Sequence, residues 1–147
     1  MSETVAATLR VRMAQKDAHY DGNLVDGARI LQLFGDVVTE ITVRMDGDEG
    51  LLNGYSEIEF KTPVYIGDYI EVSARLVGRS RLRRVVEFTA RKYIAARYEQ
   101  GATRAELLGE PVVVCRAVGT AVVPRDAARR RPAGTGGTAH ADVSRAE

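Results

Sequence analysis

The order of hydrophobic and polar positions predicts a strand followed by one long helix. Between Thr8 and Gln15 apolar and polar residues alternate, which is the period-two pattern of a half-buried strand. Apolar positions then recur with helical spacing, and we expect this helix to begin at an Asn23 N-cap and to run to about Met45. Its core-facing stripe consists of Ile30, Phe34, Val37, Val38 and Ile41.

Alternation returns after the helix and predicts an antiparallel sheet. The segment "LLNGYSEIEF", residues 51–60, alternates between two faces. One face carries Ser56, Ile58 and Phe60, and the other carries Tyr55, Glu57 and Glu59. Further strands are expected at about residues 69–77, 82–94 and 112–123. Residues 96–110 have no strand pattern, so we expect a short helix or a loop there.

One strand, one long helix and four further strands indicate an α+β fold with a five-stranded sheet. A chain of 147 residues that is 45% hydrophobic can bury a core as one domain, which we place at residues 1–124. One helix can cover such a sheet but cannot also enclose a ligand, so we expect a second copy to supply the missing wall. Residues 125–147 are rich in Arg, Gly and Ala and are expected to form a disordered tail.

Charge and composition narrow the classes of partner. The 21 basic and 20 acidic residues leave a formal charge of +1, so no global field favours nucleic acid or an anionic membrane. The basic segment "ARRRP" at residues 128–132 has no recognition helix or aromatic platform beside it, which argues against a nucleic-acid partner. Neither a signal peptide nor a long apolar segment is visible, so we expect a cytoplasmic protein without a membrane partner.

The single cysteine is Cys115, in the apolar run "PVVVCRAVGTAVV". This setting favours a small buried side chain in a reducing compartment over a nucleophile. The sequence has no His/Cys cluster with metal-ligand spacing, so we expect no metal site.

Four segments resemble those of the hot-dog-fold β-aminoacyl-CoA ammonia-lyases. They are "KDAHYDGNLVDGARILQLFGDVVTE", "DGDEGLLNGYSEIEF", "PVYIGD" and "EPVVVCRAVGTAVVP", and the resemblance extends over about residues 9–124. The block "DAHYDGNLVDGAR" and the ending "LFGD" are selective, whereas hot-dog acyl-CoA thioesterases share a Pro-x-x-x-Gly-Asp like that of "PVYIGD". The resemblance implies a hot-dog fold, in which a five-stranded antiparallel sheet wraps around one long helix. It also implies a homodimer, with three dimers in a hexamer.

The resemblance further implies reversible elimination of ammonia from a β-aminoacyl-CoA. The segments "LQLFGDVVTE" and "VVVCRA" are closer to family members that convert 3-aminobutyryl-CoA to crotonyl-CoA. Coenzyme A is then part of the substrate, and no separate cofactor is expected. An acyl-CoA thioesterase and a non-catalytic acyl-CoA-binding module are the alternatives.

This elimination requires a base for the proton beside the carbonyl, stabilisation of the enolate oxygen and a group that holds the departing amine. We expect Gly22, Asn23 and Gly27 to form the enolate site, because a helix N-terminus presents N–H donors and glycine lets a carbonyl approach the backbone. A simple capping role is the alternative for Asn23. His19 suits proton transfer near neutral pH, although it can equally be an ordinary loop residue.

Carboxylates on the helix and on the following strand are the candidates for the base or for the ammonium anchor. Asp36 ranks first because it follows Gly35, which permits close approach, and because its apolar flanks suggest partial burial. Glu57 and Glu59 rank second, with a solvated sheet face as their alternative. For Glu40 we favour a solvent-facing pair with Arg44.

A basic segment between two predicted strands, "GRSRLRR", offers cations for the phosphates of coenzyme A. The candidates are Arg79, Arg81 and Arg84. A solvated basic turn is the alternative.

Overall fold

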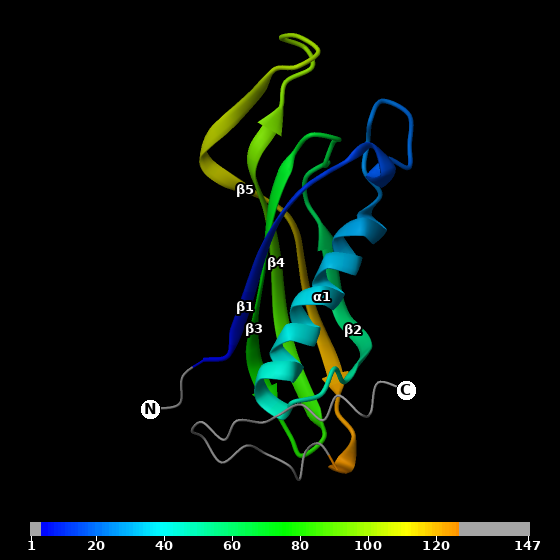
Figure 1. The fold of residues 1–147 in the computed structure, drawn as a ribbon, viewed down its shortest axis with the longest axis vertical. Coiled ribbons are helices and arrows are strands. Elements are labelled where there is room, and N and C mark those ends of the chain that lie inside the picture. The colour runs from blue at the N-terminus through cyan, green and yellow to red at the C-terminus, as the bar shows by residue number, and fades with distance from the viewer. Residues whose placement is uncertain (1–3, 127–147) are drawn as a thin grey trace, which may run out of the picture.

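The computed structural model describes residues 4–126 and shows one helix lying along a five-stranded antiparallel sheet (Figure 1). The elements in chain order are β1 (Ala6–Arg12), a short 3-10 helix (Gln15–Asp17), α1 (Gly27–Asp46), β2 (Leu51–Phe60), β3 (Tyr69–Arg79), β4 (Arg83–Ala96) and β5 (Ala105–Val122). The strand order is β1-β3-β4-β5-β2. This arrangement confirms the predicted α+β architecture. Most of the predicted tail, from residue 127 onward, lies outside the described residues.

The helix is capped at both ends by residues with the required backbone geometry. Asp26 is the N-cap, and its carboxylate accepts a hydrogen bond of 3.0 Å from the N–H of Ala28. Gly47 ends the helix in the left-handed conformation, at φ 65°. The prediction that Asn23 caps the helix is wrong. Asn23 lies in the preceding turn at φ 63°, a conformation that asparagine tolerates better than most residues.

The core lies between α1 and the sheet. Every residue of the predicted helical stripe is buried, and Leu33 is buried with them. Phe34 of α1 stacks on Phe88 of β4 with ring centroids 4.8 Å apart, so the two elements meet through aromatic rings. Small and branched side chains of β3, β4 and β5 complete this core, including Ile70, Val72, Ala74, Val86, Ala90, Val114 and Ala117.

Strand β2 contains a bulge that changes which side chains share a face. The pairing with β5 shifts between Tyr55 and Glu57, so the two residues do not lie on the same side of the sheet. Tyr55 faces α1, since its hydroxyl donates to the carbonyl of Leu31 at 3.4 Å and its ring lies 5.9 Å from that of Phe88. The predicted grouping of Tyr55 with Glu57 and Glu59 is therefore wrong, because one extra residue reverses the alternation.

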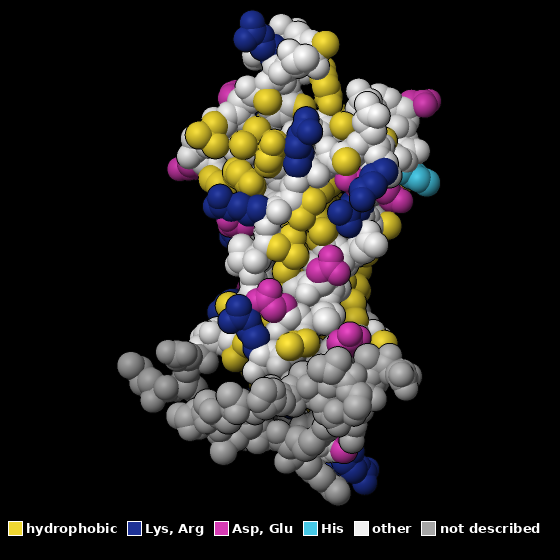
Figure 2. Space-filling view, in the orientation of Figure 1, with side chains coloured by type: hydrophobic (Ala, Val, Ile, Leu, Met, Phe, Trp, Pro, Cys, Tyr) yellow, Lys and Arg dark blue, Asp and Glu magenta, His cyan; other side chains and the backbone are white. Residues whose placement is uncertain are grey.

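The hairpin that joins β4 to β5 is longer than predicted. Strand β5 already begins at Ala105, and Leu107 pairs with Ile94. This arm projects beyond the rest of the sheet (Figure 1), and hydrophobic side chains gather on it (Figure 2). Leu107 is 73% exposed, and an interruption of the pairing around Gly109 and Pro111 separates the arm from the main sheet. The pattern of residues 105–110 lacks alternation because neither face of the arm is buried in the core.

One buried ion pair joins the end of α1 to the β3–β4 hairpin. Arg84 donates to both carboxylate oxygens of Asp46, at 2.9 and 2.7 Å, and both side chains are almost completely buried. The guanidinium also donates to the carbonyls of Ser80 and Arg83. With these contacts satisfied, the pair fixes the position of the helix end relative to the hairpin.

Replacing one member of this pair will destabilise the fold strongly. We expect Asp46→Ala to lower the free energy of unfolding by about 3–5 kcal/mol, because it leaves the Arg84 guanidinium buried without its counter-ion. The matched control is Glu40→Ala, which removes an exposed pair with Arg44 and should cost less than about 1 kcal/mol. Denaturant unfolding at one fixed protein concentration measures both values. Equal effects of the two substitutions would contradict the account.

Candidate functional site

An apolar cleft of about 550 Å³ lies at the N-terminal end of α1. Its walls come from the first turn of the helix, from the end of β2 and from the loop that follows β2. The apolar side chains that line it are Leu24, Val25, Ile30, Leu31, Phe60, Val64 and Val114. A cleft with such a lining suits an acyl chain, and the helix end beside it suits a developing negative charge.

The "PVYIGD" turn supports one wall of this cleft through a buried carboxylate. Asp68 is fully buried and accepts hydrogen bonds from the N–H groups of Tyr65 and Ala96, at 2.8 and 2.7 Å. The ammonium group of Lys92 lies 2.9 Å from Asp68 and donates to the carbonyl of Pro63. The Gly-Asp of this motif therefore has a structural role here, which is to hold Pro63 and the neighbouring wall residues in place.

A polar hollow of about 600 Å³ adjoins the cleft and shares Asp26 with it. Nδ1 of His19 lies 3.9 Å from Oδ2 of Asp26, so the histidine stands beside the helix N-cap as the sequence predicted. Arg29 lies across the same hollow, with Nε 2.9 Å from Oδ1 of the buried Asp17. That N–H does not point at the carboxylate, so the contact is an ion pair without a hydrogen bond.

Asp26 is the residue of this group that sequence reasoning missed as a candidate. Assigning the cap to Asn23 made Asp26 a first-turn residue. The structure instead places the Asp26 carboxylate at the N-terminal end of α1, which we call the helix mouth. The signal was the Asp-Gly pair at the start of the apolar stripe, since aspartate is among the best N-cap residues. Gly22 and Asn23 lie in the exposed turn before it.

Asp36 lies on the exposed face of α1, away from the cleft of its own chain. It follows Gly27 by nine positions, which corresponds to about 13 Å along the helix axis. The expected partial burial is not found within one chain. A Cβ atom added at Gly35 would meet nothing within 4 Å, so the close approach expected there is not found among the described residues of one chain. Glu40 pairs with Arg44 at 2.8 Å near the surface, as favoured from the sequence.

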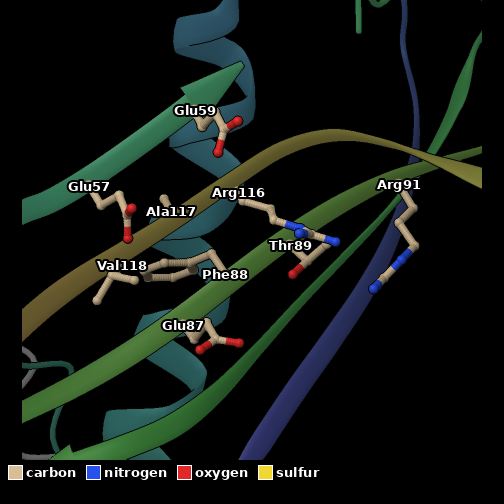
Figure 3. A pocket seen from close by; sticks show the side chains of 9 residues that line it. All are labelled: Glu57, Glu59, Glu87, Phe88, Thr89, Arg91, Arg116, Ala117 and Val118. Carbon is tan, nitrogen blue, oxygen red and sulfur yellow. The ribbon is translucent and has the colours of Figure 1, made fainter. Parts of the chain in front are cut away.

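Glu57 and Glu59 line a separate groove on the face of the sheet opposite the helix (Figure 3). The groove measures about 490 Å³ and also contains the guanidinium groups of Arg91 and Arg116. A hydrogen bond from Lys61, helped by the charges of Lys61 and Arg116, lowers the pKa of Glu59 below its ordinary value. A lowered pKa makes Glu59 a weaker base, and the sheet separates both glutamates from the cleft of the same chain.

The predicted coenzyme A cations lie at the far end of the helix. Arg79 and Arg81 belong to the β3–β4 hairpin, which meets α1 at its C-terminal residue Asp46. Arg84 is not a surface cation, because Asp46 and two backbone carbonyls engage its buried guanidinium. The expectation that Arg84 binds a phosphate is therefore corrected: the side chain holds the helix to the hairpin. Nothing in the spacing of "RLRR" marks which arginine is buried.

Cys115 is buried on β5 beneath the helix. Burial, with a smaller contribution from the charge of Glu59, raises the pKa of its thiol to about 11. At pH 7 a thiol with this pKa is ionised in about one molecule in ten thousand, which disfavours a nucleophilic role.

Among residues 4–126, no group of three His, Cys, Asp or Glu side chains is arranged to hold a metal ion. No helix in this part of the chain has the length and hydrophobicity needed to span a membrane.

Comparison with known proteins shows that the chain is similar to two ammonia lyases. The chain is 49% identical over 124 residues to 3-aminobutyryl-CoA ammonia lyase of Acetoanaerobium sticklandii, and the match covers 84% of this chain and 98% of that protein. Among solved structures it is similar to β-alanyl-CoA:ammonia lyase from Clostridium propionicum, with a TM-score of 0.79 and 37% identity. That match covers 82% of this chain and 86% of the other. No protein-family model matches.

A more distant structure shares the fold alone. A hexameric hotdog-fold thioesterase of Campylobacter jejuni superposes with a TM-score of 0.63 at 22% identity, over 80% of this chain and 83% of the other.

The raised pKa of Cys115 makes the reactivity of its thiol predictable. We expect iodoacetamide to leave the native protein unmodified at pH 8 and to alkylate it once denaturant exposes the thiol, because the thiolate is the reactive form. Intact-mass measurement over time distinguishes the two states. Rapid alkylation of the folded protein would show that the thiol is accessible and ionised.

Proposed function

The chain belongs to the hot-dog-fold β-aminoacyl-CoA ammonia lyases, and on that premise we propose that it reversibly eliminates ammonia from 3-aminobutyryl-CoA to give crotonyl-CoA. The observation that carries the proposal is the 49% identity to a 3-aminobutyryl-CoA ammonia lyase across nearly the whole of that relative. Coenzyme A enters as part of the substrate, and the proposal includes no separate cofactor. We place the enzyme in the cytoplasm, where a free thiol such as Cys115 stays reduced.

The helix mouth provides the groups that the elimination requires. A base removes the proton next to the thioester carbonyl, the double bond forms as the C–N bond breaks, and the amine leaves as ammonia. The negative charge that develops on the thioester oxygen is stabilised by the positive end of α1 around Gly27. The hydrocarbon part of the acyl group lies in the adjoining apolar cleft, against Leu31 and Val64.

We propose that His19 and Asp26 handle protons on the near side of this site. Nδ1 of His19 lies 3.9 Å from Oδ2 of Asp26 at the helix mouth, and imidazole and carboxylate groups can both take part in proton transfer. Asp36 remains the first candidate for the base or the ammonium anchor, supplied by a second copy because it faces outward on its own chain. Glu57 and Glu59 are the candidates if the Asp36 carboxylate proves dispensable.

We propose that the second copy docks along β2. This strand is an edge of the sheet and pairs only with β5 in the described chain, and its side chains from Ser56 to Phe60 are all exposed. An edge strand of ten residues offers an unpaired row of backbone donors and acceptors to another chain. Docking there would place the partner beside the cleft that the end of β2 borders. We further propose that three such dimers form a hexamer. We also propose that Arg79 and Arg81 bind phosphates of coenzyme A.

The direct test is the reverse reaction. Crotonyl-CoA is incubated with ammonium and the purified protein, and mass spectrometry is used to detect the ammonia adduct of the intact thioester. We expect enzyme-dependent formation of 3-aminobutyryl-CoA, because a catalyst of the elimination also catalyses its reverse. Release of free coenzyme A alone would favour a thioesterase, and the absence of both products would favour a binding module.

Mixing two inactive variants tests whether the site is shared. We expect Asp36→Asn and His19→Gln each to lower turnover about a hundredfold or more while coenzyme A binding is retained. If Asp36 and His19 of one site come from different chains, a mixed dimer has one site with both residues intact. Refolding an equal mixture should then restore about a quarter of parental activity, because about half of the dimers are mixed and half of their sites are intact. Activity that stays at the level of the single variants would place both residues in one chain.

A further inference from the structure

The end of β2 places an aromatic ring directly over the first residue of α1. A Cβ atom built at Gly27 would lie only 2.7 Å from Cε1 of Phe60, so the ring occupies the space that any larger residue at position 27 would need. Both residues line the apolar cleft. The ring therefore forms the cleft wall at the point where the helix begins.

The backbone that carries this ring is firmly held. Phe60 is the last residue of β2 and pairs with Cys115 of β5. The next two N–H groups, of Lys61 and Thr62, both donate to the carbonyl of Val114, at 2.9 and 3.4 Å. Because these pairings hold the backbone of Phe60 and of the two residues after it, the ring can rotate while its Cα atom stays beside the helix.

The Phe60 ring is more exposed than the residues that form the floor of the cleft. Ile30 and Val64 are buried and belong to the core, so replacing them would disturb packing. Phe60 is 56% exposed and lies outside the core cluster, so its ring limits the cleft without supporting the fold. A side chain in this position can control the size of a ligand at little cost to stability.

We infer that Phe60 sets the length of acyl chain that the enzyme accepts, by closing the cleft against Gly27. The inference rests on the proposed function and deepens it, because it assigns specificity for short β-aminoacyl groups to one side chain. With the thioester carbonyl at the N-terminal end of α1, the acyl chain enters the cleft past the Phe60 ring, which narrows the room beside Gly27 that a longer chain would need. Phe60 makes no contribution to proton transfer and acts only on which substrates fit.

The experiment compares Phe60→Ala with the parental protein over a series of 2-enoyl-CoA substrates of four, five and six carbons in the presence of ammonium. We expect the ratio of kcat/KM for the six-carbon to the four-carbon substrate to rise about tenfold or more in Phe60→Ala, a typical effect of one or more methylene groups in an apolar pocket. Phe60→Leu should give an intermediate ratio, and it serves also as the folded alternative if the alanine variant is unstable. The matched control is Val77→Ala on β3, an exposed apolar residue that lies outside both the cleft and the proposed docking strand, which should leave the ratio unchanged.

A binding measurement separates this inference from the proposed function. Calorimetric titration of the same variants with butyryl-CoA and hexanoyl-CoA, which have no double bond to attack, should show the same shift in relative affinity. If the parental protein adds no ammonia but the affinity ratio still shifts, the lyase assignment fails and the role of Phe60 stands. If the parental protein is an active lyase and neither ratio changes in Phe60→Ala or Phe60→Leu, the acyl chain lies elsewhere and the inference is overturned.

Discussion

The packing of one helix along the sheet determines where every other candidate group lies. Leu33, Phe34 and the rest of the apolar stripe bury one side of α1, which fixes its rotation about its own axis. A buried ion pair and a capping hydrogen bond then fix its two ends. The Arg84–Asp46 pair holds the C-terminal end to a hairpin, and the Asp26 cap orders the N-terminal end beside the cleft. The helix dipole therefore points its positive end at a defined place on the protein surface.

The two ends of the helix serve different purposes because their surroundings differ in polarity. At the C-terminal end, Arg84 and Asp46 are buried and paired with each other, which gives rigidity and makes neither available to a ligand. At the N-terminal end, an apolar cleft and a polar hollow meet at Asp26, so an acyl chain and a charged amine can be recognised side by side. Asp68, which is buried in the loop wall, holds that wall to the end of β4.

Sequence reasoning succeeded where periodic burial controls the structure and failed where a single local interaction does. The helical stripe and the succession of one strand, one helix and four further strands along the chain follow from apolar spacing, which the core enforces. The bulge after Tyr55 depends on one inserted residue, and the choice of Asp26 over Asn23 as cap depends on the backbone of one turn. The burial of Arg84 depends on Asp46, which lies 38 positions away in the chain, so no local sequence pattern predicts that Arg84 is buried. Asp36 and His19 were chosen as candidates by residue type, and no sequence pattern gives the distance between them.

The central claim is that a working site requires two copies of the chain, because one chain leaves Asp36 facing outward and an edge of β2 unpaired. Sedimentation velocity combined with an activity assay over the same dilution series tests this claim most directly. The account predicts a dimer or a larger assembly at working concentration, with activity per chain falling in proportion as monomer appears. A monomer that retains full activity would contradict it.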